Sequence, residues 1–515
     1  MNKKEIGEYY TPVNLVFSMV EYIKKQISNM DVLEPSAGDG RFVSPLLNYN
    51  PKTLDCIELF ETKCEKIRRI SDSKNLNVIC NDFIDFSLSS SKKYDLIIGN
   101  PPYIKKTNMN SEIINNSARL LEKLEIDKIK IENIWVSFIL ASVKLLKANG
   151  SIFFILPFEF LQVNYSEELR LYLEEKFNKI EIIVFDNKVF NNIEQDVCLL
   201  YLTNDNNYNK EYIKYSVVKD ENDITNPIYE SKIMKNKPLK KWTNSIITDK
   251  ETELLKKKSE LFKKIKTYAD ISPGIVTGNN SFFIKNKEFI DITEAPNIPI
   301  ISKSVLVGNK LIFNNQDFEF LAKDFKEVYL LTLNQEMKSY SKGLQTYLKL
   351  GEKTGYNTTY KCKTHKPWYN VPIIAKGDLL FFKRFHLLPK LIINEADIYT
   401  TDISYNIRLN KKYDKYSFGF CFYNSLTLAM SEYLGRFYGG GVCEMIPNEF
   451  KDLPLPYKVI SKEKINKLNN MIEIGCSVDQ ITNLVDEEVL KDHFSNEELL
   501  IIQEIRRKLI SRRIK

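Results

Sequence analysis

The feature that most constrains this chain is the alternation of short apolar segments with amphipathic ones over its first two hundred residues. Apolar runs of strand length lie at 32–33, 54–59, 76–80, 94–98, 151–156, 182–185 and 197–202. Stretches such as 15–27 and 135–147 carry apolar residues at helical spacing instead. Strand–helix alternation of this kind predicts an α/β fold, with a doubly wound, mostly parallel sheet covered by helices on both faces.

The polar run Asn204-Asp205-Asn206-Asn207 interrupts this alternation, and we expect the sheet to end there. After about residue 240 the chain consists of short segments rich in Tyr, Phe, Ile and Lys, separated by turn signals such as Gly439-Gly440-Gly441. From about Ser461 the pattern is helical again. We therefore predict three parts: an α/β domain over 1–240, a mixed α+β domain over 241–456 and a helical C-terminal segment over 457–515.

Composition excludes several classes of protein. The chain has 515 residues, of which 43% are hydrophobic and 27% charged, as is typical of globular proteins. No uncharged apolar run approaches the ~18 residues that cross a bilayer, and no apolar signal-peptide core follows the N-terminus. We expect no membrane association and a cytoplasmic location. The net charge of +7 permits a polyanionic partner without requiring one.

Cysteine and histidine usage argues against metal and hydrolytic sites. The eight cysteines include no Cys-x-x-Cys pair and have no histidine at ligand spacing, so we expect no zinc module, no disulfide framework and no metal. The three histidines are His365, His386 and His493, and none lies near a nucleophile elbow. A Ser-His or Cys-His mechanism is therefore not expected.

Three loops after the first three predicted strands describe a slot for a nucleoside. Gly38 and Gly40 follow the first strand, where glycine lets a backbone approach a ligand closely. Glu58 ends the second strand, as suits a ribose diol, and Asp82-Phe83 follows the third, as suits an adenine ring. Taken singly, the glycine loop is typical of an ordinary turn, and each acidic residue is typical of an exposed surface position. Together they predict a nucleoside slot without a phosphate cradle, which fits S-adenosylmethionine.

The decisive motif is Asn100-Pro101-Pro102-Tyr103, at the end of the fourth predicted strand. Proline has no N–H donor, so the loop presents carbonyl acceptors. The Asn100 side-chain oxygen and the Pro101 carbonyl can both accept from one planar NH2 group, while the Tyr103 ring stacks on the base that carries it. Two fixed acceptors favour a tetrahedral nitrogen, whose lone pair can attack a sulfonium methyl without a metal. The alternative is a rigid turn with no chemistry.

These motifs resemble the gamma class of adenine-specific DNA methyltransferases, which includes TaqI-type and Eco57I/PstI-type enzymes. The resemblance rests on Asn100-Pro101-Pro102-Tyr103, on the loop from Glu34 to Gly40 and on Gly7-Glu8-Tyr9-Tyr10-Thr11-Pro12. It covers residues 6–205 with specific motifs and the rest more loosely. It implies a Rossmann-like S-adenosylmethionine-dependent methyltransferase domain, followed by a target-recognition domain that corresponds to our predicted segment 241–456.

The resemblance also implies a role for each matching residue. Around the cofactor it places Thr11 and Pro12 at the methionine end, Glu34, Gly38 and Gly40 along the pocket, Glu58 on the ribose hydroxyls, and Asp82 and Phe83 on the adenine. At the target base it places Asn100 and Pro101 on the amino group, Tyr103 on one face of the flipped base and Phe190 on the other. An ordinary hairpin core position is the alternative for Phe190.

DNA contacts are expected in the second domain, where basic residues are interleaved with aromatic ones. We expect Lys361, Lys363 and Lys366 to contact phosphates, and Trp368 or Arg384 to reach a groove. A solvated loop over a local core is the alternative. The basic C-terminal run, Arg506-Arg507-Lys508 and Arg512-Arg513, is expected to form a solvated helix face, with a phosphate-contacting arm as the alternative.

The sequence thus predicts a site-specific DNA methyltransferase that transfers a methyl group from S-adenosylmethionine to the N6 amino group of a flipped adenine in double-stranded DNA. We expect it to act as a monomer and to protect host DNA in a restriction-modification system, without physically requiring a separate cognate endonuclease. Alternatives are methylation of ribosomal RNA or of a protein glutamine, a fused restriction-methylation enzyme, and a non-enzymatic DNA-binding specificity module. The Thr-Pro motif and the long second domain disfavour the RNA and glutamine alternatives.

Overall fold

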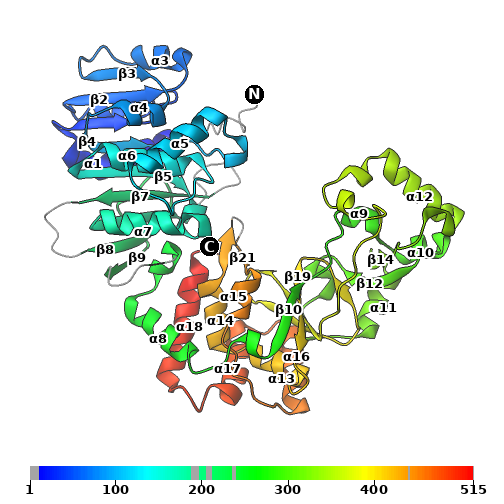
Figure 1. Cartoon of the computed structure of the whole chain (residues 1–515). Helices are drawn as coiled ribbons and strands as arrows, with labels where there is room; N and C mark the ends of the chain where they lie inside the picture. The colour runs from blue at the N-terminus through cyan, green and yellow to red at the C-terminus, as the bar shows by residue number, and fades with distance from the viewer. Residues whose placement is uncertain are drawn as a thin grey trace. The chain divides into compact units, whose positions relative to one another are not determined.

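The computed structural model describes residues 11–186, 196–204, 211–234, 239, 241–438 and 441–513. It divides into two compact units, residues 1–250 together with residue 515, and residues 251–514 (Figure 1). Both contain helices and strands, and among the described residues no helix combines the length and apolar character needed to cross a membrane. The predicted assignment of separate functions to 1–240, 241–456 and 457–515 remains a prediction.

The first unit is built on a nine-stranded sheet in the order β3-β2-β1-β4-β5-β7-β6-β8-β9. Its strands are β1 (Asp31–Glu34), β2 (Thr53–Glu58), β3 (Leu76–Cys80), β4 (Tyr94–Gly99), β5 (Leu146–Pro157), β6 (Lys179–Phe185), β7 (Val197–Thr203), β8 (Tyr212–Val218) and β9 (Tyr229–Met234). The first five pair in parallel, whereas β7 runs antiparallel to β5 and β6. The predicted doubly wound α/β sheet is confirmed.

The predicted end of the sheet near Asn204 is wrong. β8 pairs in parallel with β6, from Lys179 opposite Tyr212 to Phe185 opposite Val218, and β9 then pairs antiparallel with β8. The polar run is therefore followed in the sequence by further strands of the same sheet. Its composition hid the continuation, because turn residues mark the end of a strand but not the end of a sheet.

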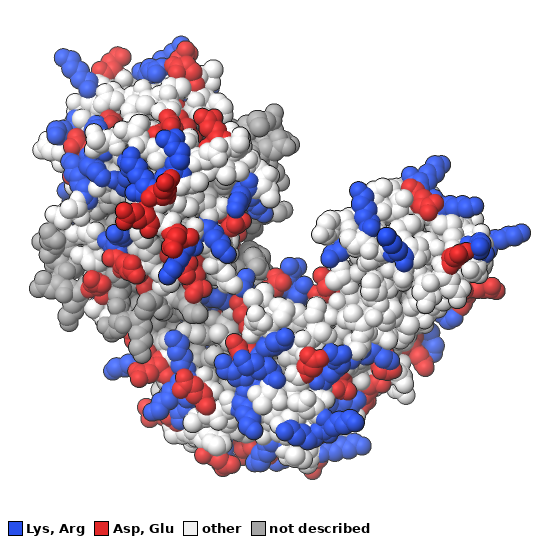
Figure 2. Space-filling model, viewed as in Figure 1, with Lys and Arg blue, Asp and Glu red and all other residues white. Residues whose placement is uncertain are grey.

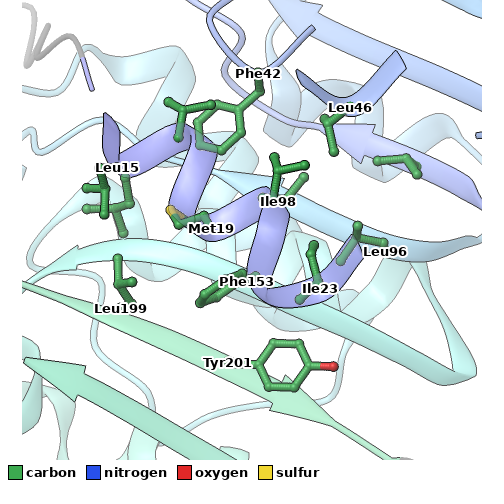
Figure 3. Close-up of a cluster of buried hydrophobic side chains, with 14 of the residues drawn as sticks. Leu15, Met19, Ile23, Phe42, Leu46, Leu96, Ile98, Phe153, Leu199 and Tyr201 are labelled. Atoms are coloured by element: carbon green, nitrogen blue, oxygen red, sulfur yellow. The ribbon is translucent and has the colours of Figure 1, made fainter. Parts of the chain in front are cut away.

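One face of the sheet packs against α1 (Val13–Ile27) and α2 (Val43–Leu47). Figure 3 shows Leu15, Met19 and Ile23 of α1 turned toward strand residues such as Leu96 and Phe153. The three helical residues are spaced four apart, which aligns them on one side of the helix. This packing closes the core below the loops that follow β1 and β4.

Further helices complete the first unit. They are α3 (Glu61–Arg68), α4 (Phe83–Ser89), α5 (Ser111–Lys123), α6 (Ile134–Leu145) and α7 (Glu167–Lys176). The next helix, α8 (Asp249–Ser259), belongs almost entirely to the second unit. α4, α5 and α6 contact one another and lie on the face of the sheet that is turned to the viewer in Figure 1. Helices on both faces leave the carboxyl ends of the parallel strands as the accessible edge.

The second unit contains three smaller sheets. Their strand orders are β10-β19-β15-β17-β13, β11-β14-β12-β18 and β16-β21-β20. The strands are β10 (Ala269–Pro273), β11 (Ile284–Lys285), β12 (Asn297–Ile301), β13 (Ile312–Phe313), β14 (Tyr329–Leu331), β15 (Leu379–Phe382), β16 (Arg384–Phe385), β17 (Lys390–Asn394), β18 (Tyr399–Thr400), β19 (Ser404–Leu409), β20 (Arg436–Tyr438) and β21 (Val442–Glu444). This bears out the predicted mixed α+β character.

Helices of the second unit lie between and after these strands. They are α9 (Asn280–Phe283), α10 (Lys287–Thr293), α11 (Asn315–Lys323), α12 (Lys342–Lys353), α13 (Lys415–Phe422), α14 (Ser425–Leu434), α15 (Pro447–Lys451), α16 (Lys462–Glu473), α17 (Val478–Val489) and α18 (Asn496–Ser511). The predicted helical C-terminal segment corresponds to α16, α17 and α18. Of these, α18 packs along α14, so the segment forms part of the second unit.

The structure contradicts both interpretations for three of the five residues of the basic C-terminal run, whereas Arg507 is exposed. Arg506, Arg512 and Arg513 are each 5–6% exposed, and so form neither a solvated face nor a free arm. Arg513 pairs with the buried carboxylate of Glu432 on α14 and donates to the Gly441 carbonyl at 2.6 Å. Arg506 donates to the Leu387 carbonyl at 2.5 Å. The sequence showed only a run of charges, whereas long-range partners make Arg506 and Arg513 internal anchors.

Candidate cofactor and target-base site

The loops that follow β1, β2, β3 and β4 surround one pocket at the carboxyl edge of the first unit's sheet. β1 pairs with both β2 and β4, so the chain order changes direction at β1, which is where open α/β sheets bind ligands. The space between these loops measures about 890 Å³, a volume that includes open solvent at the pocket mouth. Its lining includes Gly38, Glu58, Asp82, Phe83, Asn100 and Pro101, all of which the sequence singled out. The structure therefore brings the predicted nucleoside slot to one cavity with Asn100, Pro101 and Pro102, whereas Tyr103 is not part of the lining.

Glycine is required at two positions of the loop after β1, for a different structural reason at each. Both have positive φ, +60° at Gly38 and +80° at Gly40, where a side chain would be strained. A Cβ on Gly38 would meet no atom within 4 Å, and this residue lines the pocket. A Cβ on Gly40 would lie 2.3 Å from Ile70, and Gly40 is absent from the lining. Gly38 thus keeps the pocket open, whereas Gly40 allows the loop to pack beside α3.

Glu58 at the end of β2 is an oriented carboxylate. It is 7% exposed. One of its oxygens accepts from the Gly38 N–H at 2.9 Å, and the other accepts from the Phe60 N–H at 3.1 Å. Each carboxylate oxygen has two lone pairs, so these bonds leave capacity for two further donors. A vicinal diol is a ligand group that supplies two donors.

Asp82 begins α4 and faces the same pocket. One of its oxygens caps the helix by accepting from the Asp85 N–H at 2.9 Å, which fixes the direction of the side chain. Burial raises the pKa of this carboxyl above its ordinary value. The next residue, Phe83, is buried and packs on Phe138 of α6, with 5.0 Å between ring centroids. An acceptor beside a pair of aromatic rings suits a flat heterocycle with an amino group.

Four residues that the resemblance assigned to the cofactor, Gly40 among them, do not line the pocket. Glu34 lies beneath it, 2% exposed, with the Cys56 thiol donating to its carboxylate at 3.7 Å. Burial raises the pKa of Glu34 well above its ordinary value. Thr11 and Pro12 precede α1, and neither belongs to the lining of this pocket. Their assigned roles at the methionine end remain predictions.

Asn100 is held from three directions. Its Nδ2 donates to the Thr11 hydroxyl oxygen at 3.2 Å, and its Oδ1 accepts from the Tyr103 hydroxyl at 3.1 Å. Its backbone carbonyl accepts from the Ser36 hydroxyl at 3.0 Å. The Tyr103 hydroxyl also lies 3.2 Å from the Ile155 carbonyl. The amide therefore has a defined orientation, with Oδ1 on the side of Tyr103.

Sequence reasoning missed part of the pocket wall. Phe60 and Lys63, at the start of α3, line it, and the Lys63 ammonium lies 5.2 Å from the Phe60 ring centroid. Phe138 reaches the pocket from α6, within a helix whose side chains are almost all buried. Phe60 follows Leu59, which directly follows Glu58, the predicted ribose ligand. This position beside Glu58 was the one sequence feature that could have indicated its place in the pocket wall. Phe138 has no such feature, because it resembles its apolar neighbours in the sequence.

One group of ligand-type atoms lies near the pocket although the sequence predicted no metal site. The Glu61 carboxylate and the thiols of Cys64 and Cys80 lie within 4.8 Å of one another. A hydrogen bond to Glu61, with burial, raises the pKa of the Cys80 thiol to about 12. The Cys64 thiol donates to the Glu58 carbonyl at 3.4 Å. The two cysteines are far apart in the sequence, so their spacing could not reveal the group.

The candidate DNA-contacting residues lie in the second unit and differ in exposure. Lys361, Lys363 and Lys366 are exposed. Trp368 instead packs on Phe282, with 5.5 Å between ring centroids, and donates to Glu352 at 3.1 Å. Arg384 is exposed and pairs with Glu444 at 3.1 Å. The assignment of Lys361, Lys363 and Lys366 to phosphates, and of Trp368 or Arg384 to a groove, remains a prediction. Phe190 lies outside the described residues.

Comparison with known proteins identifies two related family models in this chain. The Eco57I restriction-modification methylase model matches residues 37–190, which contain the pocket loops. The model of the C-terminal domain of the Type II methyltransferase M.Eco57I matches residues 239–490. The first match falls in the first unit, and the second falls almost entirely in the second unit.

Whole-length relatives agree with these models. Type II methyltransferase M.AccI of Acinetobacter calcoaceticus is 26% identical, over 96% of this chain and 94% of its own length. Type II methyltransferase M.HindII of Haemophilus influenzae is 23% identical, over 98% of this chain and 96% of its own.

Two solved structures share the fold. The Type IIL restriction-modification enzyme MmeI in complex with DNA has a TM-score of 0.63 at 11% identity, over 99% of this chain and 80% of that one. A nuclease-deletion mutant of the Type ISP restriction-modification enzyme LlaGI has a TM-score of 0.52 at 13% identity, over 91% of this chain and 54% of that one. The two family models, together with the whole-length relatives, show that the chain belongs to the Eco57I-type family of Type II restriction-modification DNA methyltransferases.

Proposed function

We propose that this protein transfers the methyl group of S-adenosylmethionine to the N6 amino group of an adenine flipped out of double-stranded DNA. The observation that carries the proposal is the shared pocket. Glu58, Asp82 and Phe83 line it on the side of β2 and β3, and Asn100 and Pro101 line it at the end of β4. A nucleoside-shaped donor and a planar amino acceptor can therefore meet in one cavity.

The pocket fits the adenosine part of the cofactor. The ribose hydroxyls would donate to Glu58, whose oxygens are already oriented by two backbone N–H groups. The adenine would lie against Phe83 and donate its amino group to Asp82. Gly38 has no side chain where the pocket is open, so the loop can approach the ligand. When bound, the cofactor supplies an electrophilic methyl group on a positively charged sulfur.

The loop after β4 would hold the target nitrogen. The Asn100 Oδ1 and the Pro101 carbonyl would accept its two N–H bonds, which orients the lone pair toward the methyl group. Fixed acceptors also stabilise the positive charge that develops on the nitrogen. The N–CH3 bond would form as the S–CH3 bond breaks, which leaves the sulfur as a neutral thioether. This arrangement needs no general base with a shifted pKa, because the positively charged nitrogen would give its proton to water after the transfer. No metal is required by this scheme.

Tyr103 would stack on the extruded base. Extruding a base costs a few kcal/mol, and stacking on an aromatic ring contributes roughly 1–3 kcal/mol. In the described structure the Tyr103 hydroxyl donates to Asn100, so base entry would exchange this bond for bonds from the adenine amino group. Phe190 stays a candidate for the opposite face of the base.

The second unit would supply DNA affinity and sequence choice. Lysine and arginine that contact phosphate act through counterion release, independently of sequence. Figure 2 shows Lys and Arg interspersed with Asp and Glu on the face drawn, so a local group of lysines is a better candidate than the net charge as a whole. Lys361, Lys363 and Lys366 form such a group. In its host, the resulting methylation would protect the chromosome from a restriction endonuclease.

A pair of substitutions tests the division of labour within the pocket. Asn100→Ala should abolish methyl transfer to duplex DNA, while the dissociation constant for S-adenosylmethionine stays within about twofold, because Asn100 holds the acceptor nitrogen and not the cofactor. Asp82→Ala should instead weaken cofactor binding. Isothermal titration and transfer of a radiolabelled methyl group, followed by nucleoside analysis, measure both quantities. Equal loss of cofactor affinity in the two variants would contradict the proposed assignment.

A further inference from the structure

The contact between Thr11 and Asn100 joins residues that are 89 positions apart in the sequence. Thr11 directly precedes Pro12, which comes before α1, and Asn100 directly follows β4. The Asn100 Nδ2 donates to the Thr11 hydroxyl oxygen, while Oδ1 on the other side of the amide accepts from Tyr103. Thr11 thus contacts the half of the amide that is not available to a target amino group.

A side-chain amide has a donor end and an acceptor end of nearly equal size. Rotation by 180° would replace Oδ1 with Nδ2, and its two N–H groups would then oppose the two N–H groups of the adenine. Only one orientation of Asn100 can accept from the target. A partner that binds Nδ2 therefore selects the productive orientation before the base arrives.

We propose that Thr11 is a positioning residue that fixes the amide of Asn100 for catalysis. The inference rests on the proposed function and assigns Thr11 a role that acts through Asn100. Thr11 does not line the pocket, whereas Asn100 does. Its effect should accordingly appear in the rate of methyl transfer.

Thr11 is itself held firmly. It is 5% exposed, and its carbonyl accepts from the Arg41 guanidinium at 2.5 Å. Arg41 in turn pairs with Asp39 of the β1 loop at 2.9 Å. Asp39, Arg41 and Thr11 therefore connect the glycine loop to the orientation of Asn100. Because the backbone of Thr11 is held in place, its hydroxyl has a defined position beside the Asn100 amide.

The test compares Thr11→Val with Thr11→Ser. Valine keeps the shape of threonine and removes the oxygen, and serine keeps the oxygen and removes the methyl group. We expect Thr11→Val to lower the single-turnover rate of methyl transfer about tenfold, the effect of removing one neutral hydrogen bond. Dissociation constants for S-adenosylmethionine and for duplex DNA should change less than about twofold, and Thr11→Ser should restore most of the rate.

The effect of Thr11→Val is also measured in a protein that carries Asn100→Asp. A carboxylate has two equivalent oxygens and no amide orientation to select, so Thr11→Val should add little further loss to whatever transfer Asn100→Asp retains. If Thr11→Val raised the cofactor dissociation constant and left the rate at saturating cofactor unchanged, Thr11 would be a cofactor contact. If Thr11→Ser were as slow as Thr11→Val, its methyl packing would be the cause. Both results would overturn the inference.

The same experiment separates this inference from the proposed function. Full activity in Asn100→Ala would refute the function assigned to Asn100 and the positioning role with it. Loss of activity in Asn100→Ala, together with a wild-type rate in Thr11→Val, would leave the proposed function intact and refute only the role of Thr11. Thermal unfolding of each variant checks that the first unit remains folded.

Discussion

Some functional residues of this protein can be identified from the local sequence pattern, whereas their side-chain contacts come from residues that only the fold brings close. Gly38, Glu58 and Asp82 could be chosen from the sequence because each follows an apolar run at the expected place. The orientation of Asn100 could not, since its partner Thr11 lies 89 positions away. For the same reason the burial of Glu34 beneath the pocket was not visible in the loop motif. The motifs therefore indicated which residues to consider for the site, whereas the burial and the hydrogen-bond partners of these side chains required the structure.

Glu34 should make stability depend on pH. Burial raises the pKa of its carboxyl, so the folded state binds more protons than the unfolded state above the ordinary pKa of glutamate. The contribution of Glu34 to the free energy of unfolding is therefore fully present at low pH and is lost as the pH rises through the folded-state pKa. We expect Glu34→Gln to match the wild-type melting temperature near about pH 4.5 and to exceed it near about pH 8. A difference in melting temperature that is independent of pH would show that Glu34 is not protonated in the folded protein.

The two glycines of the β1 loop should respond differently to alanine. Gly40→Ala places a Cβ 2.3 Å from the Cδ1 of Ile70 and 3.3 Å from Ile67 at a φ of +80°, so Ile70 must shift and the backbone is strained, and we expect the melting temperature of the first unit to fall. Gly38→Ala meets no neighbour and projects beside the pocket, so its main effect should be a weaker affinity for S-adenosylmethionine, with a smaller loss of stability from its positive φ. Calorimetry and cofactor titration on both variants make the comparison. Equal effects of the two substitutions on cofactor affinity would contradict it.

At the level of elements, the alternation of the first two hundred residues was sufficient to predict seven strands. β8 and β9 were missed because polar connections precede them. In the second unit, strands such as β11, β13 and β16 have two residues each, too few to show a period of two. Their pairing depends on residues distant in the chain, so neither the order of the three sheets nor the docking of α18 on α14 could be predicted.

The anchoring of α18 predicts a contrast between two arginines. Arg513 forms an ion pair with Glu432 in which both side chains are at most 1% exposed. Removing one partner of a buried pair costs about 3–5 kcal/mol, because the other charge remains buried. We expect Arg513→Met to destabilise the second unit by that amount. Arg507 is about half exposed in its pairs with Asp479 and Glu504, so Arg507→Met should cost at most about 1 kcal/mol. Urea unfolding measures both, and similar losses would contradict the anchor.

For the whole molecule, we expect the two units to divide DNA binding from chemistry. Replacing Lys361, Lys363 and Lys366 with Ala should lower the slope of log affinity against log salt by nearly one unit for each phosphate that is no longer neutralised. The loss of affinity should be similar for specific and non-specific duplexes, and cofactor affinity should not change. The matched control replaces Lys287, Lys326 and Lys338, which form ion pairs on the same unit. An unchanged slope in the folded test variant would place these lysines away from DNA.

The central claim is that the shared pocket methylates adenine in DNA. Single-molecule sequencing of DNA from cells that express the protein, beside cells that express Asn100→Ala, tests it most directly. We predict N6-methyladenine at one recurring sequence in the first sample and none above background in the second. Methylated cytosine at the recurring sequence, unmodified DNA from cells that contain folded wild-type protein, or equal adenine methylation in the two samples would contradict the account.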